Sequence, residues 1–341
     1  MEYFGINKKK LPVSEDFLIP FLNPTSPGTN YWDAAPKVKI MDRQIGNSIL
    51  QFSQLVSLLR NLNTDFENKS FLDIGTGDGV IPKLLLRYTK IKRAIGIDPY
   101  LAGEYIARRK ADDNENFEDI ISVIDKRLNG SFEIENFRDL LKFEHSALRP
   151  NKFKYELNEQ IDYQFKQYGA HDCSKLNEKF DIIYCKAIEH IDKWDLILSE
   201  VSKSINKNGI FVIKHNSFFS YLGPHRYCAT MIPWGHLVLS DDEYREYVKT
   251  YHKDRYEYTI KNYFESLTYP RCTLNQFLKL AQKNDFSVKL IINEPLRFLN
   301  KVSNFISIFD NFWDMVSENF PDLSSEEIFS GRYHIILLKN N

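Results

Sequence analysis

The stretch LDIGTGDG, residues 72–79, decides the fold of this chain. A short apolar run over residues 70–74 leads into it, and an apolar pattern with helical spacing over residues 80–88 follows it. Its glycines, Gly75, Gly77 and Gly79, stand where the strand would turn abruptly into the helix. Residues without a Cβ let such a turn tighten and let a ligand lie against the backbone. The stretch therefore predicts a strand–turn–helix unit with a ligand site at its turn.

Strand and helix patterns alternate along the rest of the chain, which predicts an α/β fold with a mostly parallel sheet. The apolar runs FDIIYC and GIFVIKH are continuous, as expected of strands buried on both faces. Two strand-like segments near the C-terminus can pair antiparallel at one edge of the sheet. The expected strands are residues 70–74, 93–97, 162–166, 180–185, 209–215, 287–292 and 333–339, with helices over 80–88 and 194–205.

Several stretches do not fit a minimal core of sheet and helices. We expect an N-terminal extension over residues 1–47 and one domain over residues 48–341, with insertions at about 112–159 and 216–270. The second insertion is rich in aromatic residues and histidine and follows a strand directly. Ligands of open α/β sheets collect beyond the carboxyl ends of the strands, so these insertions are expected to form a helical and loop lid over the substrate.

A further apolar pattern recurs at three- and four-residue spacing from Phe298 to Val316. This spacing predicts one helix with an apolar stripe. We expect the stripe to be buried against the sheet or the lid, and the alternatives are a dimer interface or a membrane-surface contact.

Composition argues against several classes of protein and of site. Lys and Arg total 45 against 46 Asp and Glu, so no overall positive field favours a nucleic acid partner. No apolar run approaches the roughly 18 residues that a membrane span requires. The 4 cysteines, Cys173, Cys185, Cys228 and Cys272, form no CxxC pair, which argues against a disulfide framework and a thiolate zinc site. We expect a soluble, cytoplasmic protein with reduced thiols and of unknown oligomeric state.

The spacing of the glycines distinguishes between two kinds of cofactor. A dinucleotide site has the pattern GxGxxG, whose third glycine falls here on Val80, so the observed GxGxG counts against a nicotinamide oxidoreductase. Asp98 ends the second strand roughly 20 residues beyond the glycines, where a carboxylate can accept hydrogen bonds from both hydroxyls of a ribose. The alternatives are an ordinary tight turn for the glycines and a helix N-cap for Asp98.

Together these motifs resemble the class I S-adenosylmethionine-dependent methyltransferases over most of residues 69–215. The resemblance implies a Rossmann-like, mostly parallel seven-stranded sheet with an antiparallel C-terminal edge strand, and S-adenosylmethionine as the cofactor. It places Asp172 at the adenine amino group and the Cys173 amide at the adenine ring; a solvated loop carboxylate is the alternative for Asp172. The cofactor-binding residues that the resemblance implies are Asp73, Gly75, Thr76, Gly77, Gly79, Asp98, Asp172 and Cys173.

Methyl transfer to a hydroxyl requires removal of its proton, and a neutral imidazole is a suitable base. His190 and His215 follow the fourth and fifth strands on the face expected to hold the methyl group, and His225 lies in the lid. These histidines are the catalytic candidates, and each could instead be a hydrogen-bonded structural residue. His225 and His236 of the lid, together with Glu189 and His190, could also ligate a divalent metal, but no ligand spacing along the chain supports one, and we expect no metal.

The expected function is methyl transfer from S-adenosylmethionine to a small molecule or glycan precursor, at a hydroxyl oxygen. The lid around Trp234 and His236 suits stacking on a sugar ring or another flat acceptor. The alternatives are N-methyl transfer to a small molecule or protein, and a regulatory protein that binds S-adenosylmethionine without catalysis. The sequence does not name the acceptor.

Overall fold

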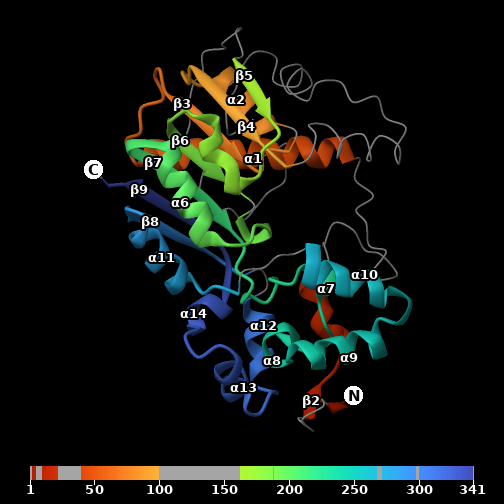
Figure 1. The fold of residues 1–341 in the computed structure, drawn as a ribbon. Coiled ribbons are helices and arrows are strands. Elements are labelled where there is room, and N and C mark those ends of the chain that lie inside the picture. The colour runs from red at the N-terminus through yellow and green to blue at the C-terminus, as the bar shows by residue number, and fades with distance from the viewer. Residues whose placement is uncertain are drawn as a thin grey trace.

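The protein folds into two lobes, a sheet lobe and a lobe of helices (Figure 1). The computed structural model describes residues 2–4, 10–21, 40–77, 79–99, 162–186, 188–266, 271–296 and 299–340. The insertion predicted at residues 112–159 lies outside these ranges.

The sheet lobe is built on a seven-stranded sheet with the order β5-β4-β3-β6-β7-β9-β8. The strands from β5 to β7 run parallel, whereas β9 pairs antiparallel with both β7 and β8. The predicted Rossmann-like α/β fold is thus confirmed, and the antiparallel C-terminal strand lies one place in from the edge. The strands are β3 (Ser70–Ile74), β4 (Arg93–Ile97), β5 (Tyr163–Lys166), β6 (Phe180–Cys185), β7 (Ile205–His215), β8 (Phe286–Pro295) and β9 (Ser330–Lys339).

Helices cover both faces of this sheet. Successive residues of a strand point to opposite faces. Phe71 packs with α1 and α2 on one face, and the adjacent Leu72 packs with α6 and α11 on the other. This two-sided burial is what the continuous apolar runs predicted. The helices are α1 (Ile40–Asn61), α2 (Val80–Tyr88), α6 (Trp194–Ser204) and α11 (Leu274–Lys283); α1 therefore begins inside the extension predicted over residues 1–47.

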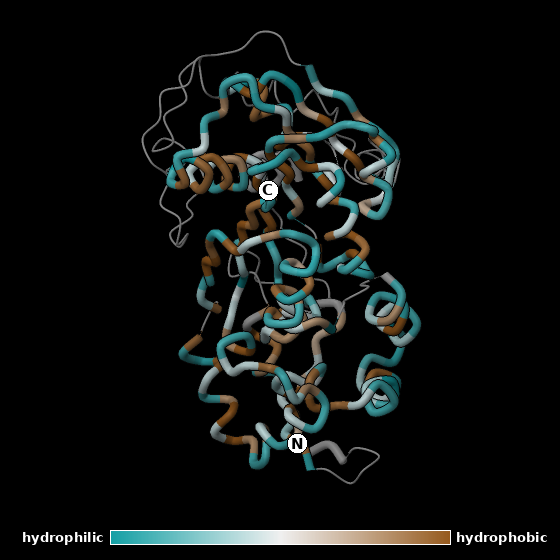
Figure 2. Tube along the Cα trace, turned by 60° about the vertical axis from the view of Figure 1, so that its left-hand side comes forward, coloured by the Kyte–Doolittle hydropathy of each residue, from teal (hydrophilic) through white to brown (hydrophobic). Residues whose placement is uncertain are grey.

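The helical lobe has a hydrophobic core of its own, formed mainly by two segments far apart in the sequence, with Leu11 and Val13 of the N-terminal segment added to them. The predicted lid contributes Phe219, Trp234 and Tyr247, and the connection between β8 and β9 contributes Val302 and Phe312. Figure 2 shows apolar segments running through both lobes, as two separate cores require. The helices of this lobe are α7 (His225–Cys228), α8 (Gly235–Val238), α9 (Asp241–Tyr251), α10 (Tyr256–Lys261), α12 (Leu299–Ile306), α13 (Phe312–Asn319) and α14 (Ser325–Ile328), with short turns η4 (Lys253–Arg255) and η5 (Asn262–Ser266).

The N-terminal segment packs onto this helical lobe. It comprises β1 (Glu2–Phe4), β2 (Lys10–Pro12) and the 3-10 helix η1 (Glu15–Phe21). The backbone amide of Ser14 donates to the Met231 carbonyl at 3.0 Å, and the Tyr221 hydroxyl donates to the Phe17 carbonyl at 2.5 Å. The lid is therefore not an isolated insertion, because segments from both ends of the chain complete it.

The apolar stripe predicted from Phe298 to Val316 is buried, but it lies on two helices and not on one. Val302 and Val316 are 0% and 3% exposed within the core of the helical lobe. Asn311 separates α12 from α13 with a φ of 63°, a left-handed conformation that interrupts the helix. Phe298 lies outside the described residues.

No helix among the described residues combines the length and the apolar character that crossing a membrane requires.

The core of the helical lobe makes its stability dependent on pH. His236 is buried, and its ring packs edge-on against Phe218 with 5.2 Å between ring centroids. Burial lowers the pKa of His236 to about 3, and the charge of Arg271 also lowers it. Hydrogen bonds to the backbone of Phe218 and Ser220 act in the opposite direction and raise the pKa. Below about pH 6.5 the unfolded chain takes up a proton here that the folded chain does not, so stability is lost as the pH falls from there towards 3.

We therefore expect His236→Leu to weaken the pH dependence of unfolding. From pH 7 to pH 5, the protonation of His236 in the unfolded state lowers the free energy of unfolding by about 2 kcal/mol. Urea denaturation at the two pH values measures this loss, and the variant should lose about 2 kcal/mol less than the wild type. An equal loss in both proteins would contradict the burial of a neutral imidazole.

Candidate active site

The glycine loop between β3 and α2 has the backbone conformation that its sequence predicted. Gly75, Gly77 and Gly79 have φ values of 72°, 55° and 69°, in the left-handed region that favours glycine. The amides of Gly75 and Thr76 both donate to the Ile97 carbonyl, at 2.9 and 3.0 Å. These bonds hold the loop over the carboxyl end of β4.

Asp98 lies beside this loop, directly after β4. Its Oδ2 accepts a hydrogen bond from the amide of Gly77 at 3.1 Å, across 21 residues of sequence. The two motifs that the sequence analysis assigned to one cofactor are therefore in direct contact. The carboxylate can accept hydrogen bonds from a ribose, and the glycine backbone offers the ribose a surface without side chains.

Asp73, the last acidic residue before the loop, is buried, and only one of its two carboxylate oxygens accepts a hydrogen bond from a described residue. Its Oδ2 accepts from the Thr76 hydroxyl at 2.8 Å, whereas its Oδ1 has no hydrogen-bond partner among the described residues. Burial raises the pKa of Asp73 to about 6, against the charge of Lys186 and the Thr76 hydrogen bond, and the charge of Asp98 raises it further. Such a carboxylate can accept a hydrogen bond from a cationic or hydroxyl group of a ligand.

The glycines of the loop are needed for two different reasons. A Cβ placed on Gly77 would meet no heavy atom of the described residues within 4 Å, so among these residues the space on this side of the loop is open. A Cβ on Gly79 would collide with the ring of Tyr163 on β5, so the third glycine is required by packing. The open space at Gly77, with Asp98 and the unsatisfied oxygen of Asp73, fits a nucleoside-bearing cofactor such as S-adenosylmethionine.

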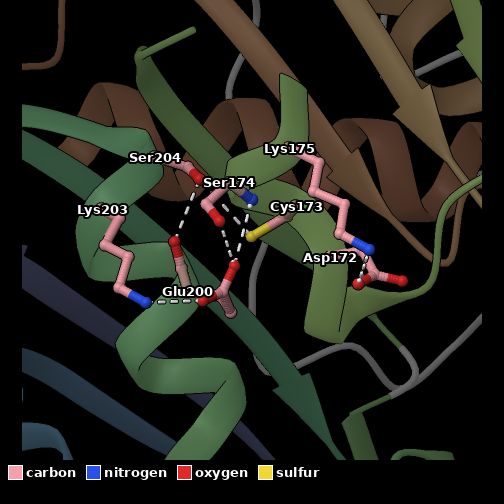
Figure 3. Close-up of polar contacts among 7 residues, drawn as sticks. All are labelled: Asp172, Cys173, Ser174, Lys175, Glu200, Lys203 and Ser204. Carbon is pink, nitrogen blue, oxygen red and sulfur yellow. Dashed lines mark hydrogen bonds and ion pairs between the residues drawn. The ribbon is translucent and has the colours of Figure 1, made fainter. Parts of the chain in front are cut away.

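The predicted adenine-contacting segment forms the 3-10 helix η2 (Ala170–Leu176), which follows β5 (Figure 3). Asp172 is half exposed and forms an ion pair with Lys175 at 2.9 Å. The Cys173 thiol is buried, with its Sγ 3.5 Å from the Ser204 hydroxyl oxygen. Burial raises the pKa of this thiol to about 11, so it is protonated at neutral pH. The thiol thus belongs to the packing against α6, and only the backbone of Cys173 remains for an adenine contact.

The same segment lies next to Asp98 along the edge of the sheet. The Asp98 amide is 3.4 Å from the Lys166 carbonyl, and the Gln167 side-chain amide donates to the Pro99 carbonyl at 3.3 Å. The chain therefore passes the ribose-binding candidate immediately before it enters η2. This order matches a cofactor laid from β3 across β4 towards β5.

Glu189, His190 and His225 converge at the carboxyl end of β6. Glu189 and His190 belong to the 3-10 helix η3 (Ile188–His190), and His225 opens α7 of the helical lobe. One nitrogen or oxygen from each of the three side chains lies within 4.8 Å of the others, and the two imidazole centroids are 5.3 Å apart. The structure thus unites residues 35 apart in sequence, and no spacing rule along the chain indicated this convergence.

The environments of these three side chains differ. Glu189 is 2% exposed, and burial raises its pKa to about 7. His190 is exposed to solvent on one side, and the partial burial of its ring lowers its pKa. Burial, with the charges of His190 and Arg332, lowers the pKa of His225 to about 4. His225 also has a φ of 53°, an uncommon conformation for a side-chain-bearing residue.

Residues that the sequence analysis did not single out hold Glu189 in place. Its Oε1 accepts from the side-chain amide of Asn216, whose own oxygen accepts from the Arg332 guanidinium at 2.8 Å. Arg332 lies 3.7 Å from Glu294, which also accepts from His334 at 2.8 Å. Asn216 could have been suspected because it directly follows β7. Arg332 carried no signal, since only the antiparallel pairing of β9 brings it here.

The other predicted histidine, His215, lies outside this cluster. It is buried, edge-on to Trp194 at 5.0 Å and stacked on Tyr333 at 6.4 Å between ring centroids. Burial lowers its pKa to about 3. The lid residues Trp234 and His236 are likewise core residues, 1% and 5% exposed. The aromatic interior of the lid is therefore closed to a ligand at Trp234 and His236, whereas η3 and the start of α7 bring Glu189, His190 and His225 together.

This chain is similar to one known protein family and to several solved structures. Residues 49–272, more than half of the chain, match the family described as "Methyltransferase domain". Among solved structures, the cyclopropane synthase MmaA2 from Mycobacterium tuberculosis is 13% identical, with a TM-score of 0.43 and coverage of 96% of this chain and 94% of that one. The magnesium protoporphyrin IX methyltransferase ChlM from Synechocystis PCC 6803, with bound SAH, is 12% identical, with a TM-score of 0.40 and coverage of 93% and 96%. No curated protein matches.

The matched region spans the glycine loop, Asp98, η2 and the cluster at the end of β6. The chain therefore belongs to the methyltransferase-domain family and is a class I S-adenosylmethionine-dependent methyltransferase.

Proposed function

We propose that this enzyme methylates a hydroxyl oxygen of a small molecule or glycan precursor. The observation that carries the proposal is the convergence of Glu189, His190 and His225 beyond the carboxyl end of β6. A hydroxyl acceptor has to lose its proton during transfer, so its site needs groups that can take up or displace that proton. The near-zero net charge of the chain, −1, also suits a small acceptor better than a nucleic acid.

We further propose how the chain holds its cofactor. Asp98 would accept hydrogen bonds from the ribose hydroxyls, since its carboxylate lies against the Gly77 amide at the open side of the loop. The Oδ1 of Asp73, which has no hydrogen-bond partner within the described ranges, would accept a hydrogen bond at the amino-acid end of the cofactor. Asp172 and the Cys173 amide would lie at the adenine, one strand further along the sheet.

The chemistry then depends on placement. S-adenosylmethionine supplies a methyl group on a positively charged sulfur, which needs no further activation. The acceptor oxygen forms a bond to the methyl carbon as the carbon–sulfur bond breaks, with the electron pair staying on sulfur, and the hydroxyl proton leaves to a base or to solvent. The chain contributes by holding the oxygen in line at the edge of the Glu189, His190 and His225 cluster. A cytoplasmic location is part of this proposal, and it is consistent with 4 cysteines that form no disulfide.

The acceptor class can be tested with S-adenosylmethionine that carries a labelled methyl group. We expect label to appear on oxygen when the protein is given a panel of sugars, sugar phosphates and hydroxylated aromatic compounds. A matched panel of amines provides the comparison. Label found only on nitrogen would replace the proposal with N-methyl transfer, and label on no acceptor despite tight cofactor binding would favour a regulatory role.

The open space at Gly77 predicts a loss of cofactor affinity in Gly77→Val. A branched side chain would fill the space that the cofactor needs, and calorimetry should show no measurable S-adenosylmethionine binding. The control is Asn63→Ala, because Asn63 has a similar φ of 56° but follows α1, away from the loop. Both variants should lose about 1 kcal/mol of stability through backbone strain, and only the first should lose the cofactor. Wild-type affinity in folded Gly77→Val would remove the cofactor from this loop.

Asp98 should contribute strongly to the affinity for S-adenosylmethionine. A hydrogen bond to a charged group contributes about 1.5–3 kcal/mol, so Asp98→Ala should raise the Kd at least about 10-fold. Asp98→Asn retains an acceptor for the Gly77 amide without the charge, and we expect an intermediate Kd. Unchanged affinity in both variants would mean that the ribose binds elsewhere.

The histidines of the cluster should affect transfer and not cofactor binding. We expect His190→Ala and His225→Ala to lower the single-turnover rate about 10²- to 10⁴-fold while the Kd for S-adenosylmethionine stays near that of the wild type. His215→Ala tests the remaining candidate, and its burial between Trp194 and Tyr333 predicts that its main effect is on stability. Near-wild-type rates in all three variants would rule out an imidazole in the chemical step.

A further inference from the structure

We propose that Glu189, His190 and His225 bind a divalent transition-metal ion that in turn binds the acceptor oxygen. The role of the metal towards the acceptor rests on the proposed methyl transfer, whereas metal binding itself does not. No metal was expected from the sequence, because no ligand spacing along the chain brings these three side chains together; only the tertiary fold does so.

The first argument is the donor set and its spacing. The candidate ligand atoms are two imidazole nitrogens and one carboxylate oxygen, all within 4.8 Å of one another. Ligands about 2.0–2.2 Å from a tetrahedral zinc ion lie about 3.3–3.6 Å apart. The side chains would therefore have to close by no more than about 1.5 Å, which rotation of an exposed His190 ring can provide.

The second argument is the unsatisfied oxygen of Glu189. This side chain is 2% exposed, its Oε1 accepts from Asn216, and its Oε2 has no hydrogen-bond partner among the described residues. Leaving a buried polar atom without a partner costs about 1–3 kcal/mol, and more for a charged one. A cation bound between Oε2 and the two imidazoles would remove that cost and would account for a carboxylate at this buried position.

The third argument is the way the ligands are supported. Ligating carboxylates and histidines are usually oriented by outer hydrogen bonds. Asn216 provides such a bond to Glu189, and Arg332 in turn fixes the Asn216 amide at 2.8 Å. The carboxylate is therefore positioned before any ion binds.

The donor set also indicates which ions and acceptors fit. Imidazole ligands suit zinc, cobalt, nickel or iron better than magnesium, which prefers oxygen. Three protein ligands leave at least one position open, as in catalytic zinc sites. An acceptor hydroxyl in that position has its pKa lowered by the cation and releases its proton to solvent water, after which its oxygen attacks the methyl carbon. In this metal-assisted transfer, His190 and His225 act as metal ligands and not as bases.

The proposal can be tested on the full-length protein by titration with Co²⁺ after treatment with EDTA. We expect one equivalent to bind and to give the visible d–d absorption of a cobalt ion with nitrogen and oxygen ligands. Zn²⁺ should displace it stoichiometrically. Glu189→Gln, His190→Ala and His225→Ala should each weaken Co²⁺ binding by about 100-fold or more, and Asn216→Ala by about 10- to 100-fold.

The matched control is His171→Ala, because His171 is also a partly exposed histidine next to a carboxylate, Asp192, but lies outside the cluster. Its Co²⁺ affinity should equal that of the wild type. Circular dichroism and thermal unfolding confirm that each variant folds, and the exposed His190 makes His190→Ala the variant safest from misfolding.

The outcomes separate metal binding from methyl transfer. Absence of stoichiometric Co²⁺ binding, or binding that survives His190→Ala and Glu189→Gln, would overturn the metal site. If the wild type binds Co²⁺ as expected but methylates no hydroxyl acceptor with or without metal, the metal site stands and the proposed acceptor fails. If O-methylation continues at the full rate in EDTA, the metal's role towards the acceptor is wrong.

Discussion

The active site depends on the register of the parallel strands. Ile74 on β3 lies opposite Ile97 on β4 and opposite Cys185 on β6, and Cys185 lies opposite Ile213 on β7. β3, β4 and β6 thus end at the same level, and β7 continues for two more residues to His215 along its pairing with β9. The glycine loop, Asp98, η3 and Asn216 all follow this row, so their positions are fixed by the pairing of buried apolar residues. A shift by one residue would turn every side chain of a strand to the other face and disperse the site.

The second half of the site comes from a separate core. The helical lobe is assembled from the N-terminal segment, the lid and the β8–β9 connection, and its interior is dominated by aromatic side chains such as Tyr221, Trp234 and Phe312. This lobe presents His225 to the end of β6 in a left-handed backbone conformation. Such a conformation in a residue with a side chain persists only where the surrounding structure determines it. The relative position of the two lobes therefore decides whether His225 and Glu189 lie in the same site.

Much of the sheet lobe could be predicted from the sequence, and the reason is physical. Strand identity and the glycine loop are local properties: the apolar run before Gly75 and the spacing of Gly75, Gly77 and Gly79 already specify a strand, a turn and a helix. Asp98 could be predicted because one crossover in a parallel sheet returns the chain to the adjacent strand end. The convergence of Glu189 with His225, and the support from Arg332, could not. These contacts depend on how the helical lobe folds and on the antiparallel pairing of β9, neither of which leaves a pattern along the chain. The same reason explains why Trp234, which is buried, was expected at the substrate: the aromatic content of a segment does not tell whether its side chains face a core or a ligand.

Several ionisable residues are buried near the carboxyl ends of the parallel strands, and their pKa values are shifted. Burial raises the pKa of Asp73 to about 6 and that of Glu189 to about 7, and it lowers the pKa of Lys214 to about 7. Apolar residues would fill these positions at a lower cost in stability, because ion pairing alone rarely offsets the free energy of removing a charge from water. Yet all three lie near the carboxyl ends of strands: Asp73 and Lys214 are the next-to-last residues of β3 and β7, and Glu189 lies in η3, shortly after β6. Perturbed groups gathered in this way are characteristic of functional sites. Under the proposed function the strand ends divide into two parts. The cofactor part lies around Asp73 and Asp98, and the acceptor part lies around Glu189, whose carboxylate is held by Asn216 beside histidines from both lobes. The methyl group would pass between these two parts, so the parallel register that sets β3 beside β6 would also set the direction of transfer.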